Sequence, residues 1–190
     1  MMEPIYEAVV TTIGREGRVH VAPMGVRYRG PLVVLMPFRP STTLDNILAS
    51  EHAVLNLVTD TRVFAGCVTG RRDWPTVAAD RVTGARLACA LGHVELELES
   101  LHDDAQRPTL DMRRVFEATH APFIGLNRAQ AAVVEGAVLV SRLGLLSREK
   151  VATEMAYLQI AIDKTAAGPE WEAWGWLREA VERYEERERK

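Results

Sequence analysis

The residues with the clearest chemical potential lie where a predicted strand ends and a short helix begins. They are Arg27, Arg39, Ser41, Thr42, Thr43 and Asn46. The first N–H groups of a helix have no intrahelical acceptor, and the positive end of the helix dipole favours an anion. Hydroxyls at the helix start can donate to that anion, and an arginine can add a charge-assisted, bidentate contact. The pattern predicts a phosphate site. In the alternative interpretation, Ser41 only caps the helix and both arginines are solvated.

A second polar group follows the strand predicted over residues 53–58. Asn56, Thr59 and Asp60 could face the same crevice as the helix start. The same residue types are ordinary turn formers at strand ends, so the sequence leaves both interpretations open. Trp74 and the segment 123–128 are candidate walls for a flat ring.

Signatures of a catalytic centre are missing from the rest of the chain. No dinucleotide-binding, P-loop, nucleophile-elbow or zinc-protease motif occurs. Glu95, Glu97 and Glu99 alternate along one predicted strand, which favours a solvated face. The histidines lack metal-ligand spacing and are expected at the surface or in turns: His20, His52, His93, His102 and His120. The catalytic residues are therefore unknown, and no metal site is predicted.

The elements that would position these residues change character near residue 125. Before it, β-branched and alternating runs indicate strands at residues 5–13, 19–28, 32–36, 53–58, 85–100 and 109–120. A short helix is predicted from Ser41 or Thr42 to Leu48, while residues 60–84 are expected to be irregular with a possible short helix over 62–69.

After residue 125 the hydrophobic period becomes helical. Asn127 is placed to cap a helix over residues 128–143, Ser147 caps a second, and Gly168-Pro169 starts a third. Strands followed by helices indicate an α+β fold. We expect a strand-rich core over residues 1–125 and C-terminal helices over residues 126–190.

Composition limits the partners and the compartment. With 190 residues, a net charge of −3 and a pI near 6.0, the chain lacks the basic character of a nucleic-acid-binding protein. No run approaches the roughly 18 apolar residues of a membrane helix. No signal peptide is apparent, and Cys67 and Cys89 lie in apolar segments without metal-binding spacing, as expected for small core residues in the cytoplasm.

The order and spacing of these motifs resemble the domain of unknown function 447 family, small FMN-binding split-barrel flavoproteins of methanogens and methylotrophs. The resemblance covers nearly the whole chain. It rests on residues 5–7, 22–27, the surroundings of Asn46, 53–60, 123–128 and the closing helices.

The resemblance implies a six-stranded antiparallel split β-barrel that forms a homodimer, with FMN at the subunit interface and its phosphate near Arg27 and the Ser41–Thr43 turn. It further implies an FMN-dependent oxidoreductase that exchanges electrons with a small molecule, such as a reduced nicotinamide or deazaflavin, linked to tetrahydromethanopterin one-carbon metabolism. The alternative is a non-catalytic module that binds FMN or a pterin. The candidate cofactor contacts are Arg27, Arg39, Ser41, Thr42, Thr43, Asn46, Asn56, Thr59 and Asn127.

Overall fold

The computed structural model describes residues 3–189 and divides the chain into two compact units. The barrel unit extends to Val58 and resumes over Asp73–Phe123. The helical unit takes in Thr59–Arg72 and the chain from Ile124 onward. Each unit is built on a core of its own.

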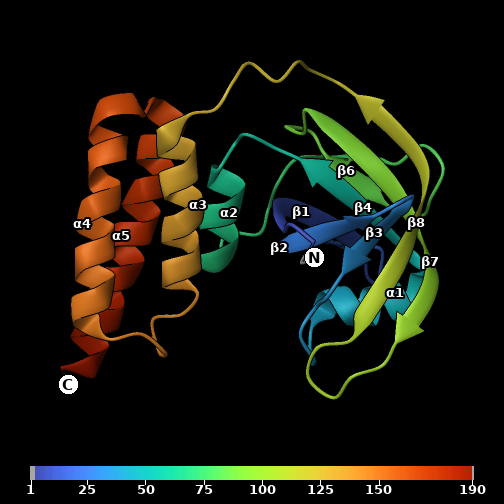
Figure 1. Ribbon diagram of the computed structural model, residues 1–190, viewed down its shortest axis with the longest axis horizontal. Helices are drawn as coiled ribbons and strands as arrows, with labels where there is room; N and C mark the ends of the chain where they lie inside the picture. Colours follow the sequence, from blue (N-terminus) through green and yellow to red (C-terminus); the bar gives the residue numbers. More distant parts are fainter. Residues whose placement is uncertain (1–2, 190) are drawn as a thin grey trace. The chain divides into compact units, whose positions relative to one another are not determined.

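The barrel unit is a closed barrel of six antiparallel strands in the order β1-β2-β3-β8-β7-β4 (Figure 1). This confirms the predicted fold. The strands are β1 (Tyr6–Ile13), β2 (Val19–Arg29), β3 (Leu32–Leu35), β4 (His52–Leu57), β7 (Gly92–His102) and β8 (Thr109–Thr119). Gly17 has a positive φ of 76° in the β1–β2 turn, a conformation that favours glycine.

Alternation along the strands fills the barrel interior. Val10, Val26 and Leu55 belong to one buried apolar cluster, while their neighbours along each strand point outward. The helix α1 (Thr42–Ser50) adds Leu44 and Ile47 to this cluster. Burial of these apolar side chains is the main force that holds the barrel together.

A two-stranded ribbon covers part of the outer face of the barrel. It consists of β5 (Thr76–Ala78) and β6 (Ala85–Leu87), and we call residues 76–87 the cover ribbon. Its backbone is bonded to barrel side chains, because the Thr11 hydroxyl donates to the Ala85 carbonyl and Leu87 N–H donates to Asn56 Oδ1 at 2.7 Å. A Cβ at Gly84 would lie 2.9 Å from Val54 Cγ2, so glycine lets the ribbon approach β4 closely.

The sequence predictions for this region need correction. The expected strand over residues 85–100 is two strands, β6 and β7, because the chain turns at residues 88–91. The segment 60–84 contains the expected short helix, α2 (Arg62–Val68), and also an unexpected strand of the cover ribbon. Cys67 is half-buried and Cys89 is exposed, so neither is a core residue.

The helical unit contains α2, α3 (Arg128–Val140), α4 (Arg148–Thr165) and α5 (Gly168–Glu188). Val63 and Phe64 of α2 are buried, and α2 packs on α3 and α5. The predicted caps Asn127 and Ser147 are confirmed, although α3 ends three residues before the predicted position. Among residues 3–189, no helix is both long and apolar enough to cross a membrane.

Candidate functional site

The N-terminus of α1 has the features of an anion site. Ser41 is the N-cap, and its Oγ accepts a hydrogen bond from Leu44 N–H at 3.2 Å. This bond uses the hydroxyl as an acceptor, so its O–H stays available as a donor. Thr42 is exposed and Thr43 is buried. The capping role of Ser41 and an anion contact at the first turn are therefore compatible.

The two candidate arginines differ in their partners. Arg27 follows the buried Val26 and so lies on the outer face of β2, half-buried, with Nη1 2.9 Å from the Met36 sulfur. Within residues 3–189 no carboxylate pairs with Arg27. Arg39 is exposed, and its Nη2 lies 2.8 Å from Asp103 Oδ1. Arg27 therefore keeps a positive charge that a sulfur atom cannot neutralise, whereas the charge of Arg39 is already matched.

The two candidate asparagines of the barrel unit serve its hydrogen-bond network. Asn46 is buried and its Nδ2 donates to the Thr12 hydroxyl at 2.9 Å. Asn56 is fully buried; its Nδ2 lies within 3.2 Å of three acceptors, and its Oδ1 holds the cover ribbon at Leu87. The amide of Asn56 is fully bonded within the unit, and a role in cofactor binding stays a prediction for both residues.

Thr59 and Asn127 belong to the helical unit. Thr59 is half-buried, three residues before α2 begins. Asn127 Oδ1 accepts hydrogen bonds from Ala129 and Gln130 N–H, and its Nδ2 donates to the Thr165 carbonyl at 3.1 Å. The structure thus gives Asn127 a capping role, and its cofactor role remains a prediction.

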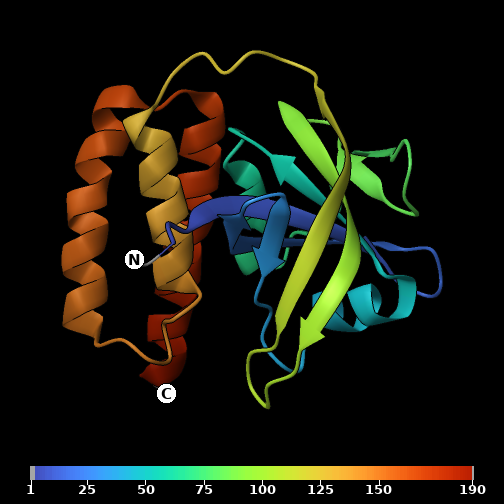
Figure 2. The same cartoon turned by 45° about the vertical axis from the view of Figure 1, so that its right-hand side comes forward.

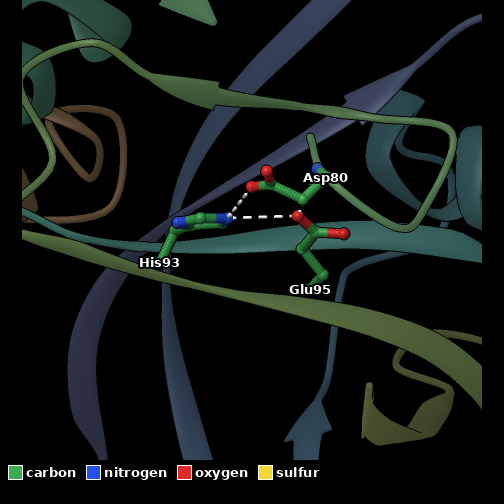
Figure 3. Close-up of side chains that lie close together, drawn as sticks. All are labelled: Asp80, His93 and Glu95. Atoms are coloured by element: carbon green, nitrogen blue, oxygen red, sulfur yellow. Dashed lines mark hydrogen bonds and ion pairs between the residues drawn. The ribbon is translucent and has the colours of Figure 1, made fainter. Parts of the chain in front are cut away.

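A cluster of ionisable side chains that the sequence pattern did not predict lies under the cover ribbon (Figure 3). His93 and Glu95 have exposed fractions of 1% and 0%, so the predictions of a surface histidine and of a solvated Glu95 were wrong. His93 Nε2 lies 3.1 Å from Glu95 Oε1 and 3.7 Å from Asp80 Oδ2. Of the three alternating glutamates, Glu97 and Glu99 reach solvent and Glu95 does not.

The carboxylate of Glu95 has a complete set of donors. Its Oε1 accepts from Asp80 N–H at 2.6 Å and from His93 Nε2, and its Oε2 accepts from Arg81 and Val82 N–H at 2.7 and 2.9 Å. Burial alone raises the pKa of Glu95, but the three backbone donors and His93 outweigh it, and the net pKa lies below its usual value. Glu95 is therefore an ionised carboxylate that anchors the ribbon.

These residues fit a metal ion poorly. An ionised carboxylate has about four lone-pair sites, and four donors occupy those of Glu95. A cation would have to displace backbone N–H groups or His93 to reach it. Asp80 and His93 alone are fewer protein ligands than a zinc site uses.

A second histidine extends the cluster to the surface. His93 Nδ1 lies 2.9 Å from Nε2 of the exposed His120, with ring centroids 5.1 Å apart and planes 12° apart. Because the nitrogens are much closer than the centroids, the two rings meet edge to edge in nearly one plane. His120 N–H donates to the Leu91 carbonyl at 2.7 Å, which fixes the backbone at this point.

Family models match both parts of the chain. The model described as protein of unknown function (DUF447) N-terminal domain matches residues 6–121, and the model described as protein of unknown function (DUF447) matches residues 127–179. The chain belongs to the DUF447 family. None of the curated proteins matches this DUF447 chain.

Solved structures share its fold. The FMN-bound DUF447 protein from Methanosarcina mazei is 22% identical with a TM-score of 0.79, over 94% of this chain and 96% of that one. The 2-nitrobenzoate 2-nitroreductase of Pseudomonas fluorescens is 24% identical with a TM-score of 0.54, over 62% of this chain and 65% of that one. The styrene monooxygenase flavin reductase of Pseudomonas putida is 15% identical with a TM-score of 0.50, over 60% of this chain and 81% of that one.

The capping role of Asn127 in this DUF447 chain leads to a first prediction. Asn127→Ala removes two cap bonds and the contact with Thr165, and we expect it to lower the free energy of unfolding of the helical unit by about 1–2 kcal/mol. Urea unfolding followed by tryptophan fluorescence measures the change. Arg128→Ala, at the exposed next residue, is the control. Equal stabilities of the two variants would contradict the prediction.

Proposed function

We propose that this chain is an FMN-binding flavoprotein that holds the phosphate of FMN at the start of α1. The observation that carries the proposal is the agreement in fold, over nearly the full length of both chains, with the FMN-bound DUF447 protein. The flavin reductase and the nitroreductase that share the barrel support a flavin-binding role.

The residues of the barrel unit suit a dianionic phosphate at this position. Thr42 and Thr43 occupy the first turn of α1, where backbone N–H groups lack intrahelical acceptors. Arg27 contacts Met36 in the segment that leads from β3 to α1, and no carboxylate within residues 3–189 competes for its charge. In this proposal Arg27, Ser41 and Thr42 hold the phosphate.

We further propose an oxidoreductase role with a reduced nicotinamide or deazaflavin as the electron donor, linked to tetrahydromethanopterin one-carbon metabolism. Bound FMN would supply the redox chemistry, so the protein needs to bind, orient and shield it. The lack of a nucleophile motif in the sequence is consistent with this division of labour.

We also propose that the chain works as a homodimer. Exposed apolar side chains on the barrel unit, among them Ile5, Tyr6 and Phe38, support a protein interface. Gel filtration of the dilute protein tests it, since a species of 21.1 kDa would be the monomer.

The phosphate contact gives a second prediction. Arg27→Ala should weaken FMN binding roughly 10- to 100-fold, because a charge-assisted contact contributes about 1.5–3 kcal/mol. Titration of FMN fluorescence against the purified protein gives the dissociation constants. Arg29→Ala is the matched control, since Arg29 follows two residues later on the outward side of β2 and is already paired with Glu3. Tight FMN binding by Arg27→Ala would place the phosphate elsewhere.

Turnover is tested separately on the FMN-loaded protein. Under anaerobic conditions, bound FMN should be bleached by NADH, NADPH or a reduced deazaflavin faster than free FMN is. If none of the three donors bleaches bound FMN faster than free FMN, the oxidoreductase role is rejected. The alternative, a non-catalytic module that binds FMN, would then remain.

A further inference from the structure

A continuous hydrogen-bonded chain leads from a buried carboxylate of the barrel unit to solvent: Glu95, His93, His120. We propose that this chain is an acid–base relay in which His120 Nδ1 is a general base for a small molecule with a weakly acidic O–H or N–H group. The proposal concerns the barrel unit alone and does not depend on FMN binding.

The donor count at Glu95 fixes the proton on the nitrogen of His93 that faces the carboxylate. Its four lone-pair sites are filled by donors, and three of these are backbone N–H groups. The fourth, His93 Nε2, must therefore carry a proton. In the proposed relay His93 Nδ1 is the acceptor, and His120 Nε2 carries the proton between the rings. The lone pair of His120 is thereby assigned to Nδ1, the nitrogen that does not face His93.

This arrangement orients His120 and, in the proposal, offsets part of the cost of placing a positive charge on it. When Nδ1 takes a proton, the positive charge on His120 is stabilised through the shared hydrogen bond to His93 and, beyond it, by the buried carboxylate of Glu95. A carboxylate that orients a histidine and stabilises its protonated form is the device of hydrolytic triads. Here a second imidazole extends it to the surface.

The surroundings of His120 favour its neutral, proton-accepting form. Burial, then Arg86 and His93, lowers the pKa of His120, and Asp80 opposes them. At neutral pH the ring is therefore mostly unprotonated, as a base must be. From the cover ribbon, Arg81 lies over the ring of Phe116, which in turn packs against His93.

The proposed step is a simple proton transfer. The proton of the bound O–H or N–H group moves to His120 Nδ1, and the bonding electron pair stays on the oxygen or nitrogen. The positive charge of Arg86 opposes protonation of His120. In the proposal the same charge stabilises the anion that the proton transfer leaves. The surroundings of His120 therefore favour a neutral ligand that becomes an anion when it loses its proton.

The relay is far from the proposed phosphate site along the barrel. Leu35, at the end of β3 that leads to α1, pairs with Leu110 at the start of β8. Gly92, beside His93, pairs with Thr119 at the other end of β8. Nine residues of strand span about 30 Å, and both views show α1 away from the end where β8 finishes (Figures 1 and 2).

The close approach of β7 and β8 at this end depends on Gly92. A Cβ there would lie 3.1 Å from the Ala118 carbonyl oxygen, closer than ordinary packing. Glycine therefore lets the two strand ends lie near enough for His93 to reach His120.

Nitrogen-15 NMR of the full-length chain tests the proton placement directly. We expect a through-hydrogen-bond coupling between His120 Nε2 and His93 Nδ1, and a protonated His93 Nε2. A pH titration of the His120 signals then gives its proton affinity. We expect Glu95→Gln to lower this affinity about tenfold, one pKa step, because the buried negative charge is lost. Glu97→Gln, two residues along the same strand face and exposed enough to pair with Arg113, should leave it unchanged.

A chemical readout distinguishes a relay from a ribbon anchor. Diethyl pyrocarbonate acylates unprotonated imidazole, and peptide mass spectrometry gives the rate at His120 relative to the exposed His102. We expect this ratio to fall several-fold in His93→Gln. The glutamine side chain can still donate an amide N–H to Glu95, so this variant tests the relay even if Glu95→Gln unfolds the ribbon. The absence of the nitrogen–nitrogen coupling would overturn the relay. So would a proton affinity and an acylation rate of His120 that stay within twofold of wild type in both variants. Either result would leave Glu95 and His93 with an anchoring role alone.

Discussion

Glu95→Ala is expected to lower the free energy of unfolding of the barrel unit by about 3–5 kcal/mol. The substitution leaves the N–H groups of Asp80, Arg81 and Val82 and the buried ring of His93 without their acceptor. Hydrogen exchange at the three backbone amides, combined with urea unfolding, measures the loss. We expect these three amides to exchange faster than in the wild type, and faster than the other amides of the barrel, because the carboxylate joins the cover ribbon to β7.

Glu97→Ala is the matched control for this experiment. Glu97 is two residues along the same strand, and its exposed pair with Arg113 is expected to contribute at most about 1 kcal/mol. If Glu95→Ala and Glu97→Ala lose the same stability, the carboxylate does not anchor the ribbon.

The same carboxylate gives the barrel unit a defined pH dependence. The folded-state pKa of Glu95 lies below its usual value, so its ionised form stabilises the fold above the unfolded-state pKa. This stabilisation is lost as the pH falls through the lower, folded-state value. The stability advantage of the wild type over Glu95→Ala should therefore be full at neutral pH and shrink in acid below about pH 4.

Trp174→Ala is expected to lower the free energy of unfolding of the helical unit by about 3–5 kcal/mol. Trp174 is 1% exposed, its ring lies against Gly136 of α3, and its Nε1 donates to Gln159 Oε1 of α4 at 2.7 Å. Removing the ring leaves a cavity between three helices and an unpaired amide. Urea unfolding followed by far-ultraviolet circular dichroism measures the change.

Trp171→Ala is the control for the second experiment. Trp171 lies about one turn earlier on the same helix and is 45% exposed, so its loss should cost about 1 kcal/mol or less. A similar loss in both variants would show that the buried ring is not the centre of the helical core.

Local sequence signals predicted most of the architecture because its causes are local. Runs of β-branched and apolar residues indicate the barrel strands, and the glycines at positions 14 and 17 mark the first turn. Ser41, Asn127 and Ser147 are caps whose bonds run to residues two or three positions ahead. Such short-range contacts can be found from spacing alone.

The features that were missed depend on contacts between distant residues. Alternation showed that Glu95 and Glu97 share a face, but the burial of one of them depends on a ribbon 13–15 residues earlier in the chain. Asparagine is a common turn residue, yet Asn56 is buried and accepts a hydrogen bond from Leu87 N–H, 31 residues away in the sequence. Likewise, the charge of Arg39 is matched by Asp103, which lies 64 residues away in the sequence.

The assignment of residues 59–72 to the helical unit has a consequence for fragments of this protein. The polypeptide passes from one unit to the other three times, so a cut near residue 125 separates α2 from the helices on which Val63 and Phe64 pack. A C-terminal piece made alone would expose the apolar surface that Val63 and Phe64 cover, and we expect it to aggregate. During synthesis, likewise, α2 leaves the ribosome some 60 residues before α3, so its apolar face awaits its partners for several seconds at common elongation rates.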